Sequence, residues 1–174
     1  MKHSIIVLLI FSCFNAISQE AVDPEKNLKT KNITLPPPAT PVANYVTSVK
    51  VGNLLFLSGH GACGKYTAVD TGKLGRTLTV EQGYQSARNV ALCMLATLKS
   101  AVGDLNKVKR IVRVFGMVNC TENFRDQPKV MNGFSDLMVE VFGERGKHVR
   151  AAVGMMALPN GIAVEVEMTV ELYE

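Results

Sequence analysis

Several features are scarce in this 174-residue sequence, and each scarcity excludes a class of protein. Tryptophan is absent and aromatic residues make up only 6% of the chain, so no platform for stacking nucleic-acid bases is indicated. The formal net charge is +4 and the basic residues are scattered, so we expect no nucleic-acid partner. No glycine-rich stretch has the spacing of a dinucleotide or P-loop phosphate site. Beyond the first 18 residues, no apolar run is long enough to cross a membrane.

Cysteine is also too sparse to indicate a disulfide-rich protein. Cys63, Cys93 and Cys120 would remain after removal of an N-terminal signal, and this odd number without close pairing predicts no disulfide framework. Cys93 lies beside the apolar stripe of a predicted helix, so we interpret it as a core residue. His60 and Cys63 are only two candidate zinc ligands, without further partners. We therefore expect neither a metal nor another cofactor.

The N-terminal segment, residues 1–18, has the pattern of a secretory signal. Lys2 is followed by an apolar run that is too short for a membrane anchor, and Ala16-Ile17-Ser18 is a small-x-small cleavage pattern. A lipoprotein signal that uses Cys13 is the alternative, although the bulky Phe11 fits it poorly. We expect a periplasmic or secreted protein that is soluble after cleavage.

Residues 19–41 are predicted to be a linker or a strap that lies on the domain. Pro36-Pro37-Pro38 and Pro41 favour an extended path and cannot continue a helix. For residues 19–32 a disordered tail is the preferred interpretation. The folded domain is predicted to cover residues 42–174.

The first half of that domain predicts a hairpin, a loop and a helix. Residues 45–59 contain two extended runs separated by Gly52-Asn53, and Leu54 to Leu57 are apolar on both faces, which favours a strand covered on both sides. Residues 60–78 read as a loop. Thr79 and Gln82 form a capping box for a helix that ends at Gly103.

The second half predicts a strand, a helix and a hairpin. Residues 108–118 are rich in β-branched side chains, and Pro128 opens a helix that Gly143 ends. From residue 162 to 172 the even positions are apolar and the odd ones mostly acidic, which predicts a two-faced strand. We expect residues 148–157 to be its hairpin partner, with Arg150 on the face of Glu165 and Glu167; an odd-length turn would reverse this.

The order of elements is ββαβαββ, which indicates a two-layer α+β domain with two helices on one face of a mixed sheet. The other face carries both apolar and acidic residues, so we expect it to be covered by another copy of the chain. A monomer with a solvated acidic face is the alternative.

Four matches together resemble the Rid/YjgF family over essentially the whole of residues 42–174. They are Tyr45 before the first strand, Gly52-Asn53 with an apolar strand ending in Ser58-Gly59, Asn132 early in the second helix, and Arg150 with Leu158-Pro159 and Glu165-Val166-Glu167. The resemblance implies a chorismate-mutase-like fold, a homotrimer and ligand sites between subunits. It also implies hydrolysis of reactive enamines and imines that carry a carboxylate.

The resemblance assigns roles to five residues. Arg150 would bind the substrate carboxylate as a two-pronged donor, and Glu165 would position a water and manage one proton. Tyr45 would line the pocket and Asn132 would help to shape it. His60 stands where the deaminase branch has glutamine, and it is either an acid–base group or a structural histidine. Ala152 replaces the cysteine of that branch.

Three functions follow from these residues. The first is hydrolysis of small enamine or imine carboxylates, although a secreted protein would not meet the imines that form inside cells. The second is binding of small carboxylates, or a holdase role, without chemistry. The third is the ribonuclease activity often associated with the family, for which the sequence offers neither a histidine pair nor a basic stripe.

Overall fold

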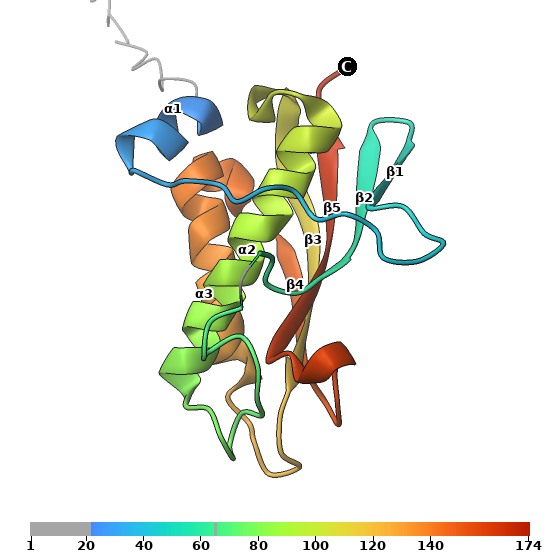
Figure 1. Cartoon of the computed structure of the whole chain (residues 1–174). Helices are drawn as coiled ribbons and strands as arrows, with labels where there is room; N and C mark the ends of the chain where they lie inside the picture. Colours follow the sequence, from blue (N-terminus) through green and yellow to red (C-terminus); the bar gives the residue numbers. More distant parts are fainter. Residues whose placement is uncertain (1–21, 65) are drawn as a thin grey trace, which may run out of the picture.

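The computed structural model describes residues 22–64 and 66–174, and the predicted signal at residues 1–18 lies outside this part (Figure 1). This part of the chain contains five strands and three α-helices. Their bounds are α1 Pro24–Thr30, β1 Ser48–Val51, β2 Leu54–His60, α2 Val80–Val102, β3 Val108–Asn119, α3 Gln127–Phe142, β4 Val149–Met155 and β5 Val164–Leu172. Short 3-10 turns at Leu105–Lys107, Gly143–Gly146 and Pro159–Gly161 join some of them.

The strands form one mixed sheet in the order β1-β2-β5-β3-β4. Helices α2 and α3 lie side by side along one face of it, and the opposite face is free of helices (Figure 1). The predicted two-layer α+β architecture is therefore confirmed. Helix α2 begins at the predicted capping box, in which Thr79 Oγ1 accepts from the amide of Gln82 and the Gln82 side chain accepts from the amide of Thr79.

Strand β5 has the two faces that its sequence predicts. Val164, Val166, Met168, Val170 and Leu172 are all buried against the helices. Glu165 and Glu167 point to the other side, which we call the open face. Because β5 lies in the middle of the sheet, its alternation sets the boundary between core and open face for every strand.

The predicted pairing of residues 148–157 with the last strand is wrong. Strand β4 instead pairs in parallel with β3, and β5 is inserted between β2 and β3. The cause is α3, which connects β3 to β4 as a crossover helix and so returns the chain in the same direction. Val114 is the register partner of both Arg150 and Met168. Arg150 therefore lies on the helix side of the sheet, opposite to Glu165, and not beside it.

The disordered tail predicted for residues 19–32 is also wrong over the part that the structure describes. Asp23 caps helix α1, and Leu28 is only 5% exposed in the core. The Asn27 side-chain amide donates to the carbonyl of Val141 at 2.8 Å, and Glu25 pairs with Lys99 at 2.6 Å. Helix α1 is thus packed against α3 and the end of α2, and the folded unit includes it.

The segment after α1 behaves as the predicted strap. It runs in an extended path across α2 to β1 (Figure 1), and Ile33 and Leu35 pack against the core. Proline at positions 36 to 38 suits this path because it needs no hydrogen-bonding partner for its nitrogen. We call residues 33–41 the strap.

A disulfide joins Cys63 to Cys93, contrary to the prediction that the chain encodes none. The two cysteines are 30 residues apart in sequence. The folding of loop 60–70 back along α2 brings them together, and no spacing rule reveals that path. Cys93 is in the core as predicted, at 2% exposure, but as half of a disulfide.

Candidate functional site

A cavity of about 400 Å³ opens where β2 ends, and it is the first of two sites that the predicted residues define. The strap forms one wall and the loop after β2 forms another. Tyr45, Ser58 and Gly59 come from the start of the domain and the end of β2. The cavity is also lined by Pro37, Pro38, Ala39, Thr40, Val42, Thr47, His60, Gly61, Ala62, Cys63, Gly64, Tyr66 and Asn160.

Glu165 lies against Gly59, one of the residues that line this cavity. A Cβ atom added to Gly59 would stand 2.3 Å from Glu165 Oε1, so the carboxylate occupies space that only glycine leaves open. Partial burial, and then the charge of Glu167, raise the pKa of Glu165 above its usual 4.5. No hydrogen bond or ion pair engages this carboxylate within the described residues. A half-buried, unpaired carboxyl group of this kind is suited to accept and return a proton.

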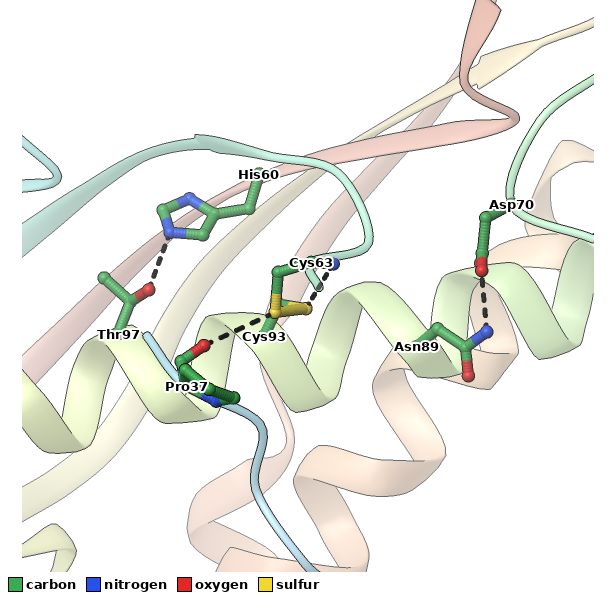
Figure 2. Close-up of a disulfide and its surroundings, with 7 residues drawn as sticks. All are labelled: Pro37, His60, Cys63, Asp70, Asn89, Cys93 and Thr97. Atoms are coloured by element: carbon green, nitrogen blue, oxygen red, sulfur yellow. Dashed lines mark hydrogen bonds between the residues drawn. A yellow bond between two sulfur atoms is a disulfide. The ribbon is translucent and has the colours of Figure 1, made fainter. Parts of the chain in front are cut away.

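His60 is also among the residues that line the cavity, and its buried ring lies between β2 and α2 (Figure 2). Nδ1 lies 2.7 Å from the carbonyl oxygen of Ser58, so this nitrogen carries the proton. Nε2 then accepts from the hydroxyl of Thr97 at 2.9 Å. Burial lowers the pKa of His60 below its usual 6.5. Both nitrogens of a neutral ring are thus occupied by hydrogen bonds within the fold.

Arg150 and Asn132 meet at a second location, on the helix side of the edge strand β4. Arg150 Nη1 donates to Asn132 Oδ1 at 3.1 Å and to Ser135 Oγ at 2.9 Å, and Nη2 donates to the carbonyl of Pro128 at 3.2 Å. All three acceptors belong to α3, so one helix holds the guanidinium on three sides. No carboxylate forms an ion pair with Arg150 within residues 22–64 and 66–174.

Ser135 and His148 support this arrangement, and the sequence did not single them out. His148 Nδ1 donates to the carbonyl of Gly146 at 2.7 Å, so its Nε2 can accept from the hydroxyl of Ser135, 3.1 Å away. Desolvation lowers the pKa of His148, which keeps the ring neutral. Ser135 follows Asn132 by three positions on α3, and this helical spacing was the one signal available in the sequence.

The predicted site residues therefore form two groups within one chain. Tyr45 lines the cavity at the end of β2, and Glu165 lies against Gly59 in the wall of that cavity. Arg150 and Asn132 lie on the opposite side of the sheet, near its far edge. In a single chain these groups cannot contact the same small molecule, because the sheet separates them.

The described residues contain no group of three or more histidine, cysteine or acidic side chains that could hold a metal ion. In the same part of the chain, no helix combines the length and apolar character needed to span a bilayer.

Residues 25–172 match the family described as YjgF/chorismate mutase-like, putative endoribonuclease. The chain belongs to this family, as its motifs predict, and the chorismate-mutase-like fold is confirmed. The match begins within α1, which agrees with the packing of that helix on the domain.

Three relatives are similar to most of the chain. Protein TCP17 of Trypanosoma cruzi is 44% identical over 84% of this chain and 92% of its own. The protein Atu1372 of Agrobacterium tumefaciens, described as of unknown function, is 38% identical, with a TM-score of 0.79 over 86% of this chain and 92% of its own. A putative endoribonuclease of Shewanella oneidensis is 33% identical, with a TM-score of 0.82 over 86% and 99%.

Proposed function

We propose that the chain assembles into a homotrimer that hydrolyses small carboxylates bearing an enamine or imine. Each site would combine Arg150 of one protomer with Glu165 of the next. The substrate carboxylate would bind the guanidinium, and the reacting carbon would lie near Glu165 and Tyr45. Small-molecule sites of this type need a few well-placed polar groups in a concave setting.

This proposal rests on the burial and the hydrogen bonds of the Arg150 guanidinium. It is half-buried and held by three hydrogen bonds to α3. The charge of Asp136 attracts it, but no carboxylate of the described residues forms an ion pair with it. Burial lowers its pKa from the usual value, yet arginine stays charged in proteins. An ordered, partly desolvated guanidinium without a carboxylate is a ready receptor for one, because a charge-assisted pair is strongest where water is scarce.

Glu165 supplies the proton transfers that the reaction needs. A water molecule would attack the imine carbon while Glu165 takes one of its protons, and the carbon–oxygen bond forms as the C=N bond becomes single. The same carboxyl group would return the proton to nitrogen, which gives a carbinolamine. The carboxylate would then take the hydroxyl proton and pass it to the amino group as the C–N bond breaks, so that ammonia leaves and the C=O bond of a 2-oxo acid forms. As the pH is lowered, protonation of Glu165 should remove the base and the rate should decline. Because the pKa of Glu165 is raised, this decline should begin at a pH above the usual 4.5.

Self-association is supported by the open face of the sheet. Phe56 is 45% exposed and its register partner Val49 is 52% exposed. The sequence predicted that β2 would be covered on both sides, and within one chain this face of it is uncovered. Arg113 stacks over Phe115 on the same face, 5.3 Å from the ring centroid. A second copy that covers these apolar residues would also bring a new edge strand, and with it Arg150, toward the cavity.

Ribonuclease activity, which the names of some relatives suggest, has less support from the side chains. General acid–base cleavage of RNA needs two titratable groups that can exchange protons with the substrate. His60 and His148 are the two histidines in the described residues, and hydrogen bonds occupy both nitrogens of each. Hydrolysis of a carboxylate-bearing imine would instead use the guanidinium of Arg150 and the carboxyl group of Glu165, and neither forms an ion pair within the described residues.

The test is hydrolysis of 2-iminobutyrate, generated in situ, by wild type, Arg150→Ala and Arg76→Ala. Arg76 is the matched control, an exposed arginine that does not line the cavity at the end of β2 and is not among the hydrogen-bond partners of Arg150. Loss of a desolvated charge partner typically costs roughly 2–5 kcal/mol, so Arg150→Ala should lower kcat/KM by about 30-fold or more. Ammonia release by wild type no faster than buffer would refute hydrolysis. Stabilisation of wild type by a small carboxylate without product would indicate binding alone.

A further inference from the structure

Three contacts fasten the loop after β2 to a single stripe of α2 (Figure 2). Asn89, Cys93 and Thr97 follow one another at intervals of four residues, so they lie on one side of the helix. The Asn89 amide donates to Asp70 at 2.9 Å, and Thr97 donates to His60 at 2.9 Å. The Cys63–Cys93 disulfide lies between these two hydrogen bonds, and it links the loop to α2 covalently.

The part of the loop held by the disulfide is also a wall of the cavity. Residues 61–64 and Tyr66 line it, and the strap faces them from the other side. The strap touches the disulfide directly, because the carbonyl oxygen of Pro37 lies 3.7 Å from Cys63 Sγ. Cys63 Sγ therefore belongs to one wall of the cavity and contacts the other.

We propose that the Cys63–Cys93 disulfide is a redox gate that holds this cavity in shape while oxidised and lets its walls separate when reduced. The gate would regulate the site of the proposed function, and in that respect it rests on that function. The separation of the cavity walls on reduction is expected whether or not the protein hydrolyses imines. The reductant is a dithiol, either a small molecule or a protein with two neighbouring cysteines.

The two sulfur atoms are not equivalent toward such a dithiol. Cys93 Sγ is in the core, at 2% exposure, whereas Cys63 is partly exposed beside the cavity. The backbone N–H of Cys63 also donates to Cys93 Sγ at 2.7 Å, which stabilises negative charge on that sulfur. Attack is therefore expected at Cys63, with Cys93 as the leaving group.

The exchange balances with the dithiol as the electron donor. One thiolate of the dithiol bonds to Cys63 Sγ, the protein S–S bond breaks, and its electron pair leaves on Cys93 Sγ, which then takes a proton. The second thiol of the dithiol attacks the mixed disulfide and releases Cys63 as a thiol. Two protein thiols and one oxidised dithiol result.

The opening should be local. Asp70 still accepts from Asn89 and from both the amide and the hydroxyl of Thr67, and His60 remains bonded to Thr97. These contacts keep the two ends of the loop on α2. Residues 61–64, between these contacts, lose the disulfide link to α2, and the strap loses the sulfur atom that Pro37 contacts.

The experiment is hydrogen–deuterium exchange of the full-length protein with and without dithiothreitol. Amides of residues 61–64 and of Ala39 and Thr40 should exchange at least about tenfold faster after reduction, while those of 89–98 keep their protection. The Cys63→Ser/Cys93→Ala variant should exchange like the reduced protein without any reductant. Cys120→Ser, which removes the free thiol and keeps the disulfide, should respond to dithiothreitol as wild type does.

Unchanged exchange of residues 61–64 after complete reduction, verified by thiol counting, would overturn the gate whether or not the double variant folds. Exchange that rises equally throughout α2 would also overturn it, because the disulfide would then stabilise the whole fold and not the cavity. If the protein hydrolyses 2-iminobutyrate, the reduced form should show a higher KM. Failure of hydrolysis with a positive exchange result would refute the proposed function and leave the gate standing.

Discussion

Replacement of Gly59 by alanine tests the role of Glu165 without touching the carboxylate itself. The new Cβ would stand 2.3 Å from Oε1 and 3.3 Å from Cδ of Glu165. Ordinary contact begins near 3.4 Å, so the carboxylate must move by about 1 Å. A displacement of that size in a catalytic group can cost about 100-fold in rate. We expect Gly59→Ala to lower kcat for 2-iminobutyrate by about that factor.

The same substitution should have little effect on stability. The atom that it meets is the end of a flexible side chain, and Gly59 is not among the glycines with positive φ. We expect the free energy of unfolding in urea to change by less than about 1 kcal/mol. A large loss of stability would mean that Gly59 serves the packing of β2, and not the placement of Glu165.

A double-mutant cycle completes the test. If Gly59→Ala acts only through the carboxylate, it should cause no further loss of kcat in a Glu165→Gln background. An equal loss in both backgrounds would show that alanine blocks the cavity directly. Full activity of Gly59→Ala would refute the assignment of Glu165 as the acid–base group.

Three further predictions concern stability and processing. Burial lowers the pKa of His60 and His148, so the unfolded chain binds more protons and the free energy of unfolding should decline as pH falls below about 6.5, measured by urea titration at pH 7.5 and 5.5. Leu28→Ala should cost about 2–4 kcal/mol because α1 is part of the core, while the exposed Lys29→Ala should cost almost nothing; equal values would contradict the docking of α1. Mass spectrometry of the exported protein should find cleavage after Ser18, and an intact N-terminus would contradict the signal.

Local patterns were sufficient to predict most helices and strands of this fold. The capping box at Thr79 and the alternation from residue 162 to 172 are properties of short segments, and α2 and β5 follow them. The pairing of β4 is not local. A hairpin with β5 and a parallel pair with β3 both satisfy the sequence of residues 149–155, and only the packing of α3 across the sheet decides between them.

The site was predictable in its residue types but not in its arrangement. Arginine with Leu-Pro and Glu-Val-Glu identified the family, yet the wrong strand pairing placed Arg150 and Glu165 on one face. The disulfide was missed for a similar reason, since Cys63 reaches Cys93 only after loop 60–70 has folded back along α2. Helix α1 was missed because its seven residues carry a single core side chain, Leu28, too little for a visible periodicity.

The central claim is that Arg150 and Glu165 act on one substrate from different protomers, and subunit mixing tests it most directly. Arg150→Ala and Glu165→Gln would each be inactive alone. In mixed rings of the two variants, about a quarter of the sites would pair an intact arginine with an intact glutamate, because each neighbour is drawn independently. We predict that co-refolding equal amounts restores about a quarter of wild-type activity. Mixed oligomers that remain as inactive as the parent variants would contradict the claim.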